Sequence, residues 1–130
     1  MDELPPYARL LGLRIADPSD GTNGECRLVM PFDDDVVGRP GYLHGGAIAG
    51  LLEFAAFTTL ARAIGDPEVG MKPITVTVDY LRGGGPHDTF ASAQILRLGN
   101  RMANVEALAW QADRSAPIAA ARLNFLLKRP

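Results

Sequence analysis

The sequence has 130 residues, of which 47% are hydrophobic, so it is long enough for one domain with a buried core and too short for two. A formal net charge of −2 provides no basic field of the kind that attracts nucleic acid or an anionic membrane. The first six residues are acidic and include two prolines, unlike the basic and then apolar start of a signal peptide. We therefore expect one cytoplasmic domain, residues 1–130, with neither nucleic acid nor a membrane as partner.

The first half of the chain has the patterns of a short helix, a strand and a long helix. Pro6 to Leu13 predicts a short leading helix, and Glu25 to Met30 alternates like a strand with Cys26 on its inner face. Because Cys26 is the only cysteine, no internal disulfide is expected, and its apolar neighbours indicate a buried thiol. Ala47 to Ile64 predicts one long helix that ends at Gly65. This helix is apolar nearly all round, so a sheet, another subunit or both must cover it.

The second half of the chain has the two-residue period of β-strands. Ile74 to Tyr80 alternates apolar residues with Thr and Asp, and Phe90 to Leu98 follows a glycine-rich turn. Ala103 to Gln111 begins after a Gly-Asn turn, and alternate residues from Ala119 to Leu127 form one apolar face. One strand, one buried helix and four consecutive strands predict an α+β fold in which an antiparallel sheet curls around the helix.

Glu53 is the most informative residue of the long helix. It interrupts the longest apolar run, Ala47 to Ala61, which is also shorter than the roughly 18 residues of a membrane span. Burying an unpaired carboxylate costs several kcal/mol, so its presence needs a reason. One reason is a structural pair with an arginine or backbone donors, and the other is a catalytic role. Small residues, Gly46, Ala49 and Gly50, precede Glu53 on its face and indicate that a ligand or a neighbouring helix comes close there.

His44-Gly45-Gly46 stands where the long helix begins. Free backbone N–H groups and the positive end of the helix dipole gather there, so the two glycines leave room for a carbonyl oxygen that becomes an oxyanion. The glycines also suit a tight turn, and His44 also suits capping or packing. Gly45 and Glu53 are eight residues, or about 12 Å, apart along a helix. If both serve one reaction, they come from two subunits across a twofold axis.

These residues resemble a known family. His44-Gly45-Gly46 with Glu53 nine positions after the histidine resembles the motif of hotdog-fold thioesterases of the phenylacetate-pathway (PaaI-like) and 4-hydroxybenzoyl-CoA types. Three further segments resemble the family's leading segment, the strand after its helix and its next turn: Tyr7 to Ile15, Ile74 to Arg82 and Leu98 to Arg101. The resemblance therefore covers nearly the whole chain.

The resemblance implies a hotdog fold and hydrolysis of an acyl-CoA thioester at the interface of a homodimer or of a homotetramer built as a dimer of dimers. Glu53 would be the nucleophile or general base, the Gly45 N–H would polarise the thioester carbonyl, and His44 would hold that end of the site. No metal or cofactor is expected, because coenzyme A is part of the substrate. The residues expected to bind substrate, its phosphates included, are Gly46, Thr58, Arg82, Gly83, Gly84 and Arg101. The alternative to substrate binding is a structural role for each residue. The arginines would then be solvated charges, the glycines would serve turns, and the threonine would cap a helix carbonyl.

The chain departs from the family at two positions. Gly38 stands where several members carry an amide that helps to place substrate or water, and Pro73 stands where a serine or threonine is expected. A protein that binds acyl-CoA without hydrolysing it therefore remains an alternative. A hydratase would need an acid and a histidine around the substrate, but the second histidine, His87, lies in the glycine-rich loop. The acyl group, and the choice between dimer and tetramer, stay open.

Overall fold

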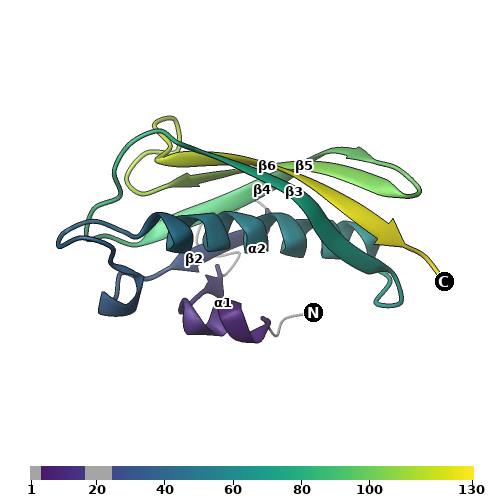
Figure 1. Cartoon of the computed structure of the whole chain (residues 1–130), viewed down its shortest axis with the longest axis horizontal. Coiled ribbons are helices and arrows are strands. Elements are labelled where there is room, and N and C mark those ends of the chain that lie inside the picture. The colour runs from purple at the N-terminus through teal and green to yellow at the C-terminus, as the bar shows by residue number, and fades with distance from the viewer. Residues whose placement is uncertain (1–3, 17–24) are drawn as a thin grey trace.

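A computed structural model describes residues 4–16 and 25–130, and in them an antiparallel sheet curves over one long helix (Figure 1). This is the predicted α+β arrangement of the hotdog fold. The six strands lie in the order β1-β2-β4-β5-β6-β3, and every neighbouring pair is antiparallel. In chain order the elements are α1 (Pro6–Leu10), β1 (Arg14–Ile15), β2 (Arg27–Met30), the 3-10 turn η2 (Asp34–Val36), α2 (Gly45–Ile64), β3 (Gly70–Tyr80), β4 (Thr89–Leu98), β5 (Met102–Trp110) and β6 (Ala119–Lys128).

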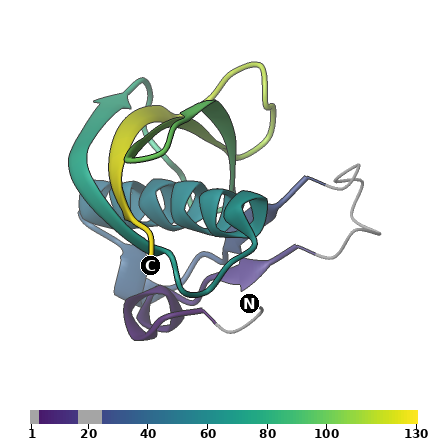
Figure 2. The ribbon, with the colours of Figure 1, turned by 90° about the vertical axis from the view of Figure 1, so that its right-hand side faces the viewer.

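The long helix α2 lies between the concave face of the sheet and α1 (Figures 1 and 2). It begins two residues earlier than predicted, at Gly45, and ends as predicted before Gly65, which has the left-handed φ of 68°. One side of α2 is buried against the sheet, at Ala47, Ile48, Leu51, Leu52, Ala55, Ala56, Thr58 and Leu60. By length and apolar composition α2 could also cross a membrane, but the core helix of a soluble fold passes the same test.

The strand β3 lies at one edge of the sheet, beside β6, although it is the first strand after the helix. Its predicted alternation is present, but a bulge between Pro73 and Thr75 takes Ile74 out of the repeat. Because β3 has a neighbour on one side only, much of its apolar surface is uncovered in the single chain, and Ile74 and Tyr80 are 50% and 54% exposed. The edge is 11 residues long, so its backbone offers a long row of pairing groups.

The structure before α2 differs from three expectations. Helix α1 ends at Leu10 rather than Leu13, because Gly12 turns the chain with a φ of 75°. The close approach predicted near Gly50 comes from the same chain, since a Cβ at Gly50 would lie 2.8 Å from Cδ1 of Leu11. Strand β2 begins at Arg27, so Cys26 precedes the strand and its thiol is only partly buried.

A cluster of charged and aromatic side chains joins β2 to the β5–β6 loop. Arg114 donates hydrogen bonds to both carboxylate oxygens of Glu25, at 3.0 Å for the Nη1–Oε2 pair, and to the hydroxyl of Ser92. The guanidinium groups of Arg114 and Arg27 also lie over the ring of Trp110, 4.6 and 5.2 Å from its centroid. These contacts hold the start of β2 against the outer face of the sheet.

Candidate active site

The amino terminus of α2 presents one open backbone donor. His44 is the N-cap, and its Nδ1 accepts a hydrogen bond of 2.9 Å from the N–H of Gly46. The carbonyl of His44 accepts from the N–H groups of Ala47 and Ile48. In the described part of the chain, the N–H of Gly45 has no acceptor. Because the positive end of the helix dipole adds to it, this N–H is suited to polarise a carbonyl oxygen.

Gly46 leaves space for this cap. A Cβ at Gly46 would lie 3.0 Å from Nδ1 of His44, the atom that accepts its own N–H. A larger residue would therefore push the imidazole away from the helix terminus. The sequence had left open whether His44 caps, packs or takes part in the site; the structure shows that it caps α2 and that its side chain is exposed.

Glu53 lies in the middle of α2 on the side that the sheet does not cover. Its neighbours one turn away on this face, Ala49 and Phe57, are partly exposed like Glu53 itself. In the described part of the chain no hydrogen bond or ion pair reaches the Glu53 carboxylate, so the structural explanation, a paired acid, is not realised within one chain.

The two threonines that follow Glu53 do not share its face. At about 100° per residue, Thr58 lies about 140° round the helix from Glu53 and is buried against the sheet. The hydroxyl of Thr59 is also buried, without a hydrogen-bond partner in the described residues. The structure therefore does not bring the predicted substrate contact Thr58 to the same surface as Glu53.

The two candidate phosphate-binding arginines lie at opposite ends of the sheet. Arg82 follows β3, and its N–H donates to the carbonyl of Ile118, just before β6. Arg101 lies in the β4–β5 turn, and its carbonyl accepts from the N–H of Leu127, near the end of β6. Ile118 and Leu127 are nine residues, or about 30 Å, apart along an extended strand. One chain therefore cannot bring both arginines to one phosphate group.

The glycine-rich loop after Arg82 packs against the segment that leads into α2. The carbonyl of Gly84 accepts a hydrogen bond from the N–H of Leu43, and a Cβ at Gly84 would lie only 2.7 Å from Cδ1 of Leu43. A side chain at position 84 would therefore displace the buried side chain of Leu43. Gly83 is exposed, and its α-carbon faces the ring of Tyr42.

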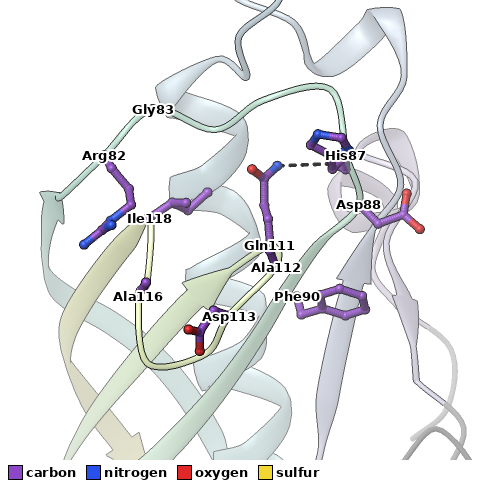
Figure 3. A pocket seen from close by; sticks show the side chains of 10 residues that line it. All are labelled: Arg82, Gly83, His87, Asp88, Phe90, Gln111, Ala112, Asp113, Ala116 and Ile118. Carbon is purple, nitrogen blue, oxygen red and sulfur yellow. Dashed lines mark hydrogen bonds between the residues drawn. The ribbon is translucent and has the colours of Figure 1, made fainter.

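A cavity of about 770 Å³ opens beside this loop (Figure 3). The carboxamide of Gln111 holds the loop in place, because its Oε1 accepts from the N–H of Gly85 and its Nε2 donates to the carbonyls of Gly85 and His87. Charges of both signs line the cavity, Arg82 with Asp88 and Asp113. One chain thus presents no concentrated positive field to a phosphate group here. In the described ranges, 4–16 and 25–130, no cluster of His, Cys, Asp or Glu could hold a metal ion.

Residues 40–118, which include both the α2 terminus and Glu53, match the thioesterase superfamily. The chain belongs to this superfamily. A solved structure from Chromobacterium violaceum is 39% identical over 95% of this chain and 83% of that chain, with a TM-score of 0.76. A Pseudomonas aeruginosa thioesterase variant is 24% identical over 93% and 84%, with a TM-score of 0.80. A Bacillus halodurans protein solved with CoA is 19% identical over 100% and 83%, with a TM-score of 0.85. Curated proteins gave no match.

Gly38, where the sequence departs from the family, packs closely against the start of α2. A Cβ at Gly38 would lie 3.1 Å from the α-carbon of His44, because the chain doubles back between them and Val37 pairs with Leu43. A side chain at position 38 would require the His44 backbone to shift by a few tenths of an ångström. The glycine thus goes with a tight approach of this segment to the α2 terminus.

Sequence reasoning missed two residues of this region, Tyr80 and Gln111. Tyr80 ends β3 and contacts Gly45, whereas Gln111 holds the glycine-rich loop. The alternation of β3 placed Tyr80 on the face of Val78, but no local pattern connects it with a residue 35 positions earlier. Gln111 follows a predicted strand and has no sequence signal that distinguishes it from a solvated surface amide.

Proposed function

We propose that this thioesterase-superfamily protein hydrolyses an acyl-CoA thioester at two identical sites of a homodimer. The observation that carries the proposal is the open N–H of Gly45 at the positive end of α2, with the unpaired carboxylate of Glu53 on the same helix. One group polarises the carbonyl and the other activates the attacking oxygen. Each site would combine Gly45 of one chain with Glu53 of the partner.

The separation of the two groups supports a dimer. They lie about 12 Å apart along α2, too far for both to act on one carbonyl carbon. A twofold axis opposite Ala49, midway between them, would bring each Gly45 next to the other chain's Glu53. The small, partly exposed side chain of Ala49 permits such a close approach of two helices.

The uncovered edge of the sheet supports the same assembly. Strand β3 is adjacent to α2 at the amino terminus of the helix, and its free edge carries exposed apolar side chains such as Ile74. Pairing of two such edges in antiparallel fashion would cover this surface and would set the two α2 helices antiparallel on the same side of a continuous sheet. This is the orientation that the composite site requires.

These two groups supply the base and the oxyanion donor of the reaction. The Glu53 carboxylate takes a proton from water while the water oxygen attacks the thioester carbonyl carbon, and the charge that develops on the carbonyl oxygen is met by the Gly45 N–H. Collapse of the tetrahedral intermediate breaks the carbon–sulfur bond. The sulfur leaves as CoA thiolate and takes up the proton that Glu53 had removed from water, which regenerates the Glu53 carboxylate and yields the free acid and CoA. In the alternative route Glu53 attacks the carbonyl carbon itself, and water hydrolyses the resulting anhydride.

The dimer also resolves the separation of the two arginines. In an antiparallel pair, Arg82 of one chain and Arg101 of the partner lie at the same end of the joined sheet, so both could approach the phosphates of one CoA. The Bacillus halodurans structure with CoA, which shares this fold, supports a CoA-type ligand. CoA carries several negative charges on its phosphates, which favours a site formed by arginine side chains from both chains.

A second function, binding of acyl-CoA without hydrolysis, is favoured by one observation. Gly38 supplies no amide to place water, and a Cβ at this position would lie only 3.1 Å from the α-carbon of His44. In that case the Gly45 N–H would still hold the carbonyl oxygen, but no water would be aligned for attack.

The experiment that separates these functions compares wild type with Glu53→Gln, which keeps the shape of the side chain and removes its basicity. Both are assayed for thiol release from aromatic, branched and straight-chain acyl-CoAs, with the oligomeric state checked. We expect a loss of kcat of at least about 100-fold in the variant, with an unchanged dimer. Binding of acyl-CoA by wild type without any turnover would reject the hydrolase and favour the binding protein.

A further inference from the structure

Tyr80 is joined to the open donor of the candidate site by a direct contact. It is the last residue of β3 and lies on the helix-facing side of the sheet, opposite the fully buried Ala119. Its hydroxyl donates a hydrogen bond of 2.9 Å to the carbonyl of Gly45. Its ring covers the bare α-carbon of Gly45, since a Cβ there would lie 3.4 Å from three atoms of the tyrosine.

This contact leaves one peptide group held at both ends. In the peptide between Gly45 and Gly46, the carbonyl accepts from Tyr80 and the N–H donates to Nδ1 of His44. The preceding peptide carries the Gly45 N–H, and its carbonyl is held by the N–H groups of Ala47 and Ile48. The open N–H therefore belongs to one anchored peptide group and adjoins a second, so its direction is set before any substrate arrives.

We propose that Tyr80 is a positioning residue that aims the Gly45 N–H at the thioester carbonyl oxygen, an inference that rests on the proposed hydrolase activity. Backbone donors stabilise an oxyanion only when they already point at its position, because no reorganisation is then needed during the reaction. In this role Tyr80 acts through the Gly45 backbone and not on the substrate oxygen. It restricts rotation of the first turn of α2, where helix ends otherwise fray.

A purely structural role accounts poorly for this hydrogen bond. As in any α-helix, the Gly45 carbonyl already accepts a hydrogen bond from the backbone N–H four residues later in α2. It therefore needs no second donor. Tyr80 is 54% exposed in the chain, so its hydroxyl could bond to water instead. The net stabilisation from such a bond is small, whereas its effect on the direction of one N–H is specific.

The test is Tyr80→Phe, which removes the hydroxyl and keeps the ring over Gly45. The matched control is Tyr7→Phe, which deletes the hydroxyl of an exposed tyrosine on α1 that has no hydrogen-bond partner among the described residues. We expect Tyr80→Phe to lose about tenfold in kcat, with KM within about twofold and the Tm and dimer unchanged. The control is expected to match wild type.

A double-mutant cycle adds a readout that a loss of stability would not produce. His44 and Tyr80 hold opposite ends of one peptide group, so Tyr80→Phe should cost less in kcat when His44→Ala has already freed the other end. His44→Asn retains a capping acceptor and should preserve the full effect of Tyr80→Phe.

The outcomes distinguish this proposal from the activity on which it rests. Turnover by Tyr80→Phe equal to that of Tyr7→Phe, or a kcat loss that follows a lower Tm and vanishes on cooling, would overturn the positioning role and leave the hydrolase intact. Absence of turnover by wild type on every acyl-CoA would overturn both.

Discussion

The composite site can be tested by restoring activity from two inactive chains. Gly45→Pro removes the one N–H that the mechanism uses, at the first position of α2, where proline is well tolerated. His44 has a ψ of 134°, the extended conformation that residues before proline prefer, and a Cβ at position 45 makes only ordinary contact with Tyr80. The variant should therefore fold as a dimer and lose activity by about 100-fold or more, as expected for a lost oxyanion donor.

The second inactive chain is Glu53→Gln. In a heterodimer of the two variants, one site combines Gly45 from the Glu53→Gln chain with Glu53 from the Gly45→Pro chain, and is intact. The other site carries both substitutions. Since a symmetric dimer has two equal sites, the heterodimer should recover about half of the wild-type kcat per dimer.

The assay uses the two chains co-expressed with different affinity tags, and heterodimers isolated through both tags. Thiol release is compared with that of each parent homodimer and of wild type. Gly45→Ala, which keeps the N–H, serves as the control for the backbone substitution and should lose much less activity than Gly45→Pro. A heterodimer no more active than its parents would show that Gly45 and Glu53 do not meet across a dimer interface.

Two further predictions concern the described charged and thiol groups. Burial alone would raise the pKa of Glu25, but hydrogen bonds from Arg114, Ser92 and Arg27 outweigh it and hold the pKa below its usual 4.5. Glu25 therefore contributes stability above pH 4.5, and this stability is lost as the pH falls through the lowered pKa. The Tm of wild type should exceed that of Glu25→Gln most near neutral pH, and the difference should shrink in acid. A difference in Tm that stays constant with pH would refute this. Burial raises the pKa of Cys26, so its alkylation at pH 8 should be at least about tenfold slower in the folded chain than in urea, and equal rates would contradict the assigned environment.

The elements that depend on local pattern could be predicted from the sequence. The long helix was expected from its apolar period and the glycine after it, and it ends where predicted. The last strand shows the predicted alternation, with Ala119, Leu123 and Phe125 buried. These predictions succeed because hydrophobic period and turn residues act within a few positions of the chain.

The candidate site was only partly visible in the sequence. His44 and Gly45 stand next to each other and Glu53 follows two turns later, so a capped helix terminus with an acid about 12 Å away could be inferred from spacing alone. The sequence could not tell that the Glu53 carboxylate is unpaired in the chain, because its neighbours in space come from elements far away in sequence. The same limit led to the expectation that a ligand or partner helix approaches Gly50, where the structure places Leu11.

The sequence by itself therefore determined the long helix, the four strands that follow it and the chemical groups along α2. Tertiary structure alone decided that β3 lies at the sheet edge, that Tyr80 reaches Gly45, and that Arg82 and Arg101 lie at opposite ends. The physical reason is that strand order and register follow from the joint burial of many side chains. No single segment contains that information. Each contact joins residues that are far apart in the sequence, and such contacts produce no periodic pattern in it.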